Sequence, residues 1–243
     1  MYMKLDILAI AVHPDDIELG CAGTLMAQIA LGKKVGILDL TRGELGTRGT
    51  PEGRLQEAAD AARIMGVAVR ENAGMADGFF QNDEAHQRQL ISFIRTYQPD
   101  IVLSNAIEDR HPDHGRAAQL IYDSCFYSGL RRIETEDAKG TPQAEWRPRQ
   151  LFHFIQDRYI TPDFVVDITP YWERKKEAML AFKSQFYIPS YDSDEPQSYI
   201  SSPEFLEFIK ARAEEMGHAI GVKYGEGFTS GRRLGVRDLS AFI

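Results

Sequence analysis

Two short clusters of histidine and aspartate carry most of the chemistry that this sequence could perform. In chain order they contain His13, Asp15 and Asp16, and then His111, Asp113 and His114. Two imidazoles and one carboxylate, with a position left for water, form the ligand set of a catalytic zinc site. A closed structural site would need four protein ligands, usually including cysteine, and neither cysteine of the chain lies near both clusters. The clusters therefore predict one catalytic divalent ion, with zinc as the first choice and iron(II) as an ion that the same ligands would accept.

The clusters hold more titratable groups than three metal ligands require. Amide hydrolysis needs a base for the attacking water and an acid for the departing amine. The remaining members of the pairs Asp15/Asp16 and His111/His114 fit these roles, and Asp113 could hold a histidine in its working tautomer. Spacing alone leaves open which aspartate ligates and which acts as the base. An ordinary proline–aspartate turn is the purely structural alternative for the first cluster.

The two clusters can meet only if the strands before them are neighbours in one sheet. Apolar runs predict buried strands at 5–12, 35–40, 101–104, 151–155 and 164–166. Helical spacing and capping residues predict helices over 18–31, 51–65, 83–97 and 117–126, and two more that begin at 169 and 203. This alternation predicts an α/β fold, a Rossmann-like three-layer sandwich with a mainly parallel central sheet. Both clusters then follow the carboxyl ends of strands, where open parallel sheets bind their ligands.

The organisation of the chain follows from its length and its less regular second half. We expect one domain over residues 1–243, with 184–243 as a C-terminal loop and helix extension. Residues 130–149 are polar and contain glycine and proline, which predicts a surface excursion. The segment 184–201, rich in tyrosine, serine and proline, is too long for a simple connector and is a candidate lid or subunit contact.

Composition and charge exclude several classes of protein. With 43% apolar and 26% charged residues the chain is typical of a folded globular protein and unlike disordered or fibrous ones. A formal net charge of −8 provides no basic field for nucleic acid or for anionic lipid. Two cysteines far apart suit a reducing compartment, and no apolar run is long enough to cross a membrane, so we expect a cytoplasmic protein.

Arginines near the clusters suggest how a substrate could be held. Arg54 and Arg110 are candidates for bidentate capture of a carboxylate or of sugar hydroxyls, and a solvated surface role is the alternative for each. The glycine-rich loop 41–50 lacks the spacing of nucleotide phosphate-binding loops. His86 shares a helical face with Leu90, which predicts a packed or half-buried histidine rather than a functional one.

Both clusters resemble the motifs of one known family. Residues 13–24, His-Pro-Asp-Asp-Ile-Glu-Leu-Gly-Cys-Ala-Gly-Thr, together with residues 111–114, His-Pro-Asp-His, resemble the PIG-L (LmbE-like) zinc-dependent N-deacetylases. The stretches 41–49, 183–187 and 224–228 resemble the branch of the family that deacetylates N-acetylglucosaminyl malate on the route to bacillithiol. The resemblance extends from the first strand almost to the C-terminus and is weakest over residues 130–150.

The resemblance implies a role for each matching residue. It implies that the zinc ligands are His13, Asp16 and His114, that Asp15 is the general base, and that His111, supported by Asp113, polarises the oxyanion or protonates the leaving amine. It implies substrate contacts for Arg54, Arg110 and Tyr191. The implied reaction is removal of the acetyl group from the 2-acetamido group of N-acetylglucosaminyl malate by a homo-oligomeric enzyme with a small amino-sugar substrate. The alternatives are a deacetylase or amidase for another N-acetylglucosamine derivative or a thiol conjugate, and a non-catalytic sugar-binding module.

Overall fold

A computed structural model describes residues 3–188, 194–236 and 238. Within these residues one seven-stranded sheet has the strand order β3-β2-β1-β4-β5-β7-β6. The strands are β1 (Ile7–Ala11), β2 (Val35–Thr41), β3 (Val69–Met75), β4 (Ile101–Ser104), β5 (Gln150–Phe154), β6 (Phe164–Asp167) and β7 (Gly225–Ser230). Strands β1 to β5 run parallel to one another, and β7 pairs antiparallel with β5 and β6. The predicted α/β fold with a mainly parallel central sheet is confirmed.

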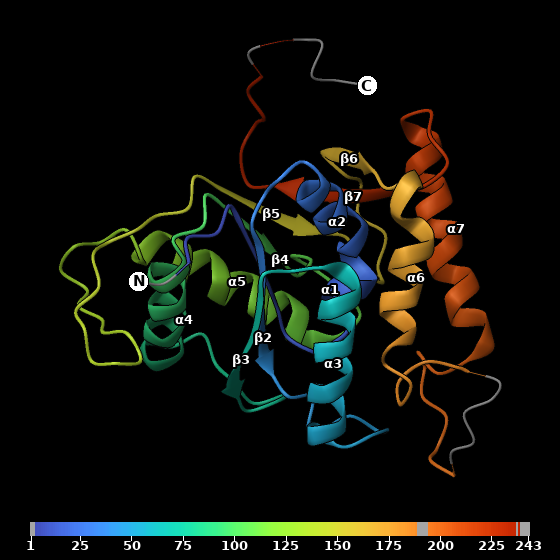
Figure 1. Cartoon of the computed structure of the whole chain (residues 1–243), viewed down its shortest axis with the longest axis horizontal. Helices are drawn as coiled ribbons and strands as arrows, with labels where there is room; N and C mark the ends of the chain where they lie inside the picture. The colour runs from blue at the N-terminus through green and yellow to red at the C-terminus, as the bar shows by residue number, and fades with distance from the viewer. Residues whose placement is uncertain (1–2, 189–193, 237, 239–243) are drawn as a thin grey trace.

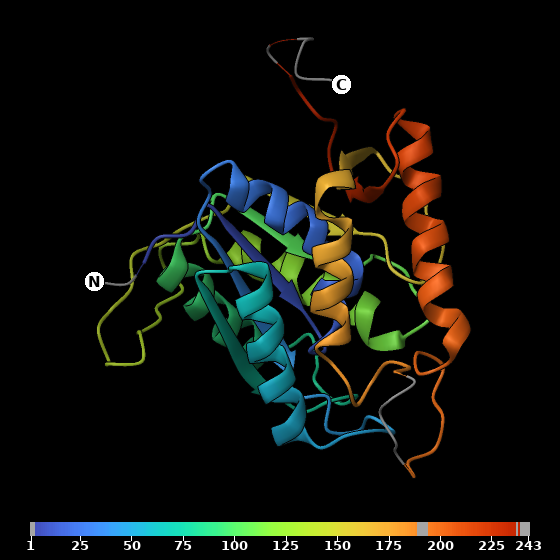
Figure 2. The same cartoon turned by 45° about the vertical axis from the view of Figure 1, so that its right-hand side comes forward.

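Helices cover both faces of the sheet (Figures 1 and 2). They are α1 (Asp16–Gly20), α2 (Ala22–Ala30), α3 (Pro51–Met65), α4 (Glu84–Tyr97), α5 (Pro112–Tyr127), α6 (Trp172–Leu180) and α7 (Pro203–Ala219), with a short 3₁₀ turn over Thr169–Tyr171 before α6. Helices α4 and α5 share one hydrophobic cluster with the sheet, whereas α2 and α6 contribute to the cluster on its other face. None of the helices in these described residues is long and apolar enough to cross a membrane.

The central strand β1 is buried on both faces because its side chains alternate between two hydrophobic clusters. Leu8 and Ile10 pack with the α4 and α5 side, and Ile7 and Ala9 pack with the α2 side. All four side chains are at most 3% exposed. A continuous apolar run is therefore what this position requires, because neither face of the strand meets water.

The helix predicted over 18–31 is two helices, and this expectation is corrected by the structure. The break lies at Cys21, whose φ of −147° is not helical. The carboxylate of Glu226 in β7 accepts hydrogen bonds from the backbone N–H groups of Gly23 and Thr24 at 3.0 and 2.7 Å. These N–H groups belong to the first turn of α2 and have no partner within the helix. A side chain from more than two hundred residues away therefore makes the break possible.

Candidate metal centre and active site

The two histidine–aspartate clusters meet at the carboxyl ends of neighbouring strands. Strands β1 and β4 are paired in register from Ile7↔Ile101 to Ile10↔Ser104. After β1, the strands β2 and β3 are added on one side of it, and β4 and β5 are added on the other side. The strand order therefore reverses between β1 and β4. Ligands in open α/β sheets bind at such a point. The first cluster follows β1 in a tight turn into α1, and the second forms the start of α5.

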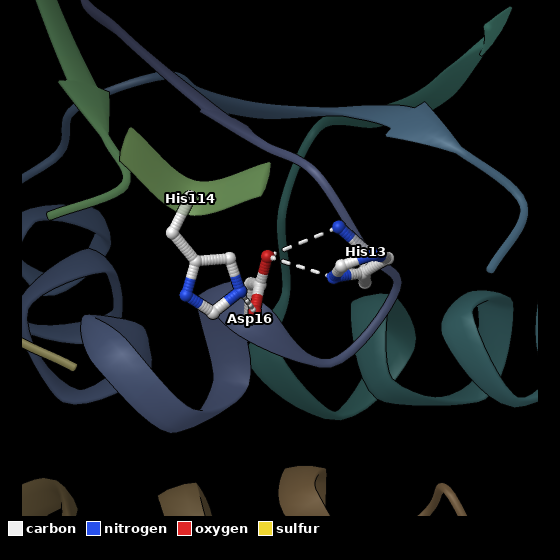
Figure 3. A group of neighbouring side chains, drawn as sticks. All are labelled: His13, Asp16 and His114. Carbon is white, nitrogen blue, oxygen red and sulfur yellow. Dashed lines mark hydrogen bonds and ion pairs between the residues drawn. The ribbon is translucent and has the colours of Figure 1, made fainter. Parts of the chain in front are cut away.

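Three side chains of the clusters offer ligand atoms to one point (Figure 3). The ligand atoms of His13, Asp16 and His114 all lie within 4.8 Å of one another. Asp16 stands between the two imidazoles, with Oδ2 3.7 Å from His13 Nδ1 and Oδ1 3.1 Å from His114 Nε2. A second group within the same limit joins His13 to His111 and Asp113. The described residues thus place the imidazoles of both clusters around one position.

Two further carboxylates contact the two histidines of the candidate metal centre. Asp77 Oδ1 lies 2.9 Å from His13 Nε2, and Asp109 Oδ2 lies 2.6 Å from His114 Nδ1. When each carboxylate accepts a hydrogen bond from the N–H of the ring nitrogen next to it, the other ring nitrogen is unprotonated and its lone pair faces Asp16. Two such nitrogens and one carboxylate oxygen fit Zn²⁺, and the same set fits Fe²⁺.

The electrostatics at His114 also favour a cation. Burial alone would lower the pKa of His114, but the charges and hydrogen bonds of Asp16 and Asp109 outweigh burial and raise it to about 10. A position that holds a proton this strongly has a negative potential, and a divalent ion can take the place of that proton.

Two amide side chains fix Asp16. Asn105 Nδ2 donates to Asp16 Oδ2 at 3.0 Å, and Gln156 Nε2 donates to Asp16 Oδ1 at 3.0 Å. The backbone N–H of His13 donates to Oδ2 as well, also at 3.0 Å. Burial pushes the pKa of Asp16 upward, but the charge of His114 and these contacts with His13 and His114 hold it well below its ordinary value. Asp16 is therefore an ionised, rigid oxygen donor.

Asp15 is held in a strained turn by Arg54. Its φ of 122° lies in the left-handed region, which costs a residue with a side chain about 1–3 kcal/mol. Arg54, only 4% exposed, donates through Nη2 to Asp15 Oδ2 at 3.0 Å and to the Pro14 carbonyl at 2.6 Å. Burial raises the pKa of Asp15 to about 7, although the Arg54 charge opposes the shift. Its side chain lines the same cavity as the three ligand residues.

His111 caps the N-terminus of α5 and is oriented by that role. Its Nδ1 accepts a hydrogen bond from the backbone N–H of Asp113 at 3.3 Å, so the proton of the neutral ring is on Nε2. Burial and the nearby charges of His13 and His114 lower the pKa of His111, which favours this neutral form. The carboxylate of Asp113 accepts from the Gly78 N–H and from Arg116, each at 2.9 Å. The hydrogen bond between Asp113 and His111 is therefore made by the backbone N–H of Asp113, while its carboxylate binds Gly78 and Arg116.

The residues predicted to hold substrate lie in different surroundings. A cavity of about 250 Å³ opens over the metal centre and is lined by both Arg54 and Arg110. The guanidinium of Arg110 lies 4.3 Å from the Tyr199 ring centroid, and its Nε is 3.3 Å from Asp157 Oδ2. Tyr191 lies outside the described residues. Arg54 Nε is buried and has no hydrogen-bond partner in the described structure.

The sequence analysis missed four residues that hydrogen-bond to the candidate metal ligands, namely Asp77, Asn105, Asp109 and Gln156. All four follow the carboxyl ends of strands: Asp77 comes after β3, Asn105 and Asp109 after β4, and Gln156 after β5. The signal that singled out the two clusters applies to these positions as well. For Asn105, Asp109 and Gln156, which follow predicted strands, it requires only that every polar residue at a strand end be treated as a candidate, whereas Asp77 follows a strand that the sequence analysis did not predict.

Comparisons with known proteins match this chain to a protein family and to a solved structure. Residues 8–125 match the PIG-L family, described as GlcNAc-PI de-N-acetylase. The chain is similar to the crystal structure of the conserved protein TT1542 from Thermus thermophilus, with 36% identity and a TM-score of 0.84 over 96% of this chain and 98% of that one.

Two relatives carry deacetylase names. The uncharacterized deacetylase YaiS of Escherichia coli K12 is 38% identical over 166 residues, which cover 64% of this chain and 84% of YaiS. The diacetylchitobiose deacetylase of Thermococcus kodakarensis is 26% identical over 231 residues, which cover 91% of this chain and 81% of that enzyme.

Proposed function

The chain belongs to the PIG-L family of N-deacetylases, and we propose that it removes the acetyl group from the 2-acetamido group of N-acetylglucosaminyl malate. The observation that carries the deacetylase proposal is the convergence of His13, Asp16 and His114 in a cavity that also presents Asp15 and His111. A binding module has no need of the last two groups. The malate-bearing substrate is supported by the resemblance of the stretches 41–49 and 224–228 and by the arginines of the cavity.

We propose that His13, Asp16 and His114 hold one divalent ion, with zinc favoured by the two nitrogens and one oxygen that they offer. When bound, such an ion acts as a Lewis acid toward an amide carbonyl and lowers the pKa of water. Asp77 and Asp109 keep the two imidazoles in the tautomers that can ligate it.

The remaining groups of the cavity then have separate tasks. The Oδ2 atom of Asp15 is fixed by Arg54, and its Oδ1 atom has no protein hydrogen bond in the described structure. Asp15 would take a proton from the attacking water as the new C–O bond forms, and would deliver it to the amine nitrogen as the C–N bond breaks. The Nε2–H of His111 would donate a hydrogen bond to the carbonyl oxygen as negative charge develops there. The products are acetate and the free 2-amino sugar.

Acetate release tests the proposal. The zinc-loaded protein is assayed with N-acetylglucosaminyl malate, with N,N'-diacetylchitobiose and with N-acetylglucosamine at equal concentrations. We expect release from the malate glycoside to exceed release from the two neutral sugars. Faster release from diacetylchitobiose would favour a deacetylase for another N-acetylglucosamine derivative. Release from none of the three, in a protein that purifies without metal, would favour the sugar-binding module.

A further inference from the structure

Helix α7 places a cation on the face that it buries. Phe205 and Ile209 are 5% and 4% exposed. Arg212 comes three residues after Ile209, so it lies on the same face of the helix. All three side chains line the cavity over the metal centre. Helix α7 contributes none of the candidate metal ligands, and it packs against the sheet through β7 and β6. Figure 2 shows it beside α6 at one end of the sheet.

The charged groups that line the cavity are nearly all paired with one another. The pairs are Asp15 with Arg54, Asp77 with His13, Asp109 and Asp16 with His114, and Asp157 with Arg110. Arg212 is the exception among the lining residues that the structure describes. Within the described residues it makes no ion pair and no hydrogen bond, and its guanidinium carbon lies 5.0 Å from the centroid of the Phe208 ring.

The two aspartates whose charges act on Arg212, Asp157 and Asp109, already have other partners. Asp157 accepts from the Tyr199 hydroxyl at 2.8 Å and pairs with Arg110 at 3.3 Å. Asp109 accepts from His114 and from two backbone N–H groups. Burial lowers the pKa of Arg212, and the charges of these two aspartates only partly oppose that effect. A partly desolvated guanidinium without a counterion is unfavourable, so its place in the cavity needs a partner that the described chain does not supply.

We infer that Arg212 is a specificity-determining residue that binds a carboxylate on the aglycone of the substrate, an inference that rests on the proposed deacetylase function. A guanidinium binds a carboxylate through two parallel N–H···O bonds, and Arg212 has all of its donors available. The carboxylate would be held by α7 while the acetamide lies over the β1 and β4 ends. The arrangement selects glycosides that carry an acidic aglycone over neutral sugars.

The test compares an acidic substrate with a neutral one. We expect Arg212→Gln to lower kcat/KM for N-acetylglucosaminyl malate by about 10- to 100-fold, the usual range for a lost hydrogen bond to a charged group. The same variant should keep kcat/KM for methyl N-acetylglucosaminide within about twofold of the parent protein, because that glycoside offers nothing for Arg212 to bind. Arg212→Lys should show a smaller loss of kcat/KM than Arg212→Gln, because lysine keeps the positive charge but cannot form the two parallel hydrogen bonds of a guanidinium.

A matched control comes from the same helix. Lys210→Gln removes one positive charge from α7, and Lys210 is 44% exposed in a surface pair with Glu214. This control should leave both substrates unaffected. A thermal melt of each variant verifies that it folds.

Free malate provides a second readout that does not depend on turnover. Calorimetric titration should show weaker malate binding to Arg212→Gln than to the parent protein or to Lys210→Gln. Equal malate binding by all three proteins, or an equal loss of kcat/KM on both glycosides, would overturn the role of Arg212. Absence of acetate release by the parent protein from either glycoside would instead overturn the proposed function, and the malate titration would still decide the role of Arg212.

Discussion

Replacing Asp109 by asparagine should weaken zinc binding without removing a ligand. Asp109 Oδ1 accepts the backbone N–H groups of Asp157 and Arg158 at 2.9 and 2.7 Å, and Oδ2 faces His114 Nδ1 at 2.6 Å. An asparagine must keep its oxygen toward the two N–H groups, so its NH₂ group turns toward His114. His114 Nδ1 then becomes an acceptor, and the ring proton moves to Nε2, the atom that faces Asp16 at 3.1 Å.

The expected loss follows from this change of tautomer. Removing the partner of a ligating histidine typically lowers metal affinity about 10- to 100-fold, which corresponds to about 1.4–2.8 kcal/mol. Competition with a chromophoric zinc chelator measures the affinity. Asp123→Asn is the control, because Asp123 lies near the surface on the helix that carries His114 and pairs with Asn82 and Gln119. Zinc affinity of Asp109→Asn within twofold of Asp123→Asn would refute the reasoning.

Three further predictions use other parts of the structure. Asp15→Asn should retain zinc in metal analysis and lose most acetate release, whereas His13→Ala should lose the zinc; normal turnover by Asp15→Asn would contradict the base assignment. Glu226→Gln leaves Lys175, 3% exposed, without the carboxylate that it contacts at 2.6 Å, so urea unfolding should show a loss of roughly 3–5 kcal/mol, and a loss below about 1 kcal/mol would contradict it. Burial raises the pKa of Cys125 to about 12 and that of Cys21 well above its ordinary value, so a disulfide reagent at pH 8 should label neither thiol in the folded protein and both after unfolding.

Strands with a run of apolar side chains were predictable, and strands without such a run were not. The run that became β1 is apolar because both of its faces are covered. The sequence of β3 looks polar, yet Arg70 in it pairs with Asp39 at 2.7 Å and with Glu18 at 2.6 Å. These counterions lie in β2 and α1, and the sequence around Arg70 does not indicate that they are its partners. The structure therefore adds β3 to the strands that were predicted.

Strand β7 was not predicted for a different reason, which is its glycine content. Glycine in a sequence usually indicates a turn. At Gly225, however, an added Cβ would lie 2.6 Å from the Val165 side chain and 2.9 Å from the backbone of Gly217. The glycine is therefore needed for the close approach of β7 to β6 and α7, and its role is packing. A close approach of this kind depends on residues from distant parts of the chain.

The limits of prediction for the site have the same origin as those for the fold. The ligand triad comes from motifs in which the residues are near one another in sequence, so residue type and spacing were enough to find them. The two carboxylates that orient the rings lie outside these motifs: Asp109 is 5 positions from His114, and Asp77 is 64 positions from His13. Asp77 comes two residues after β3, so the rule that strand ends supply site residues could find it only once β3 was recognised. The missed strand and the missed carboxylate are thus connected, because Asp77 can be found as a residue at a strand end only where β3 is predicted as a strand.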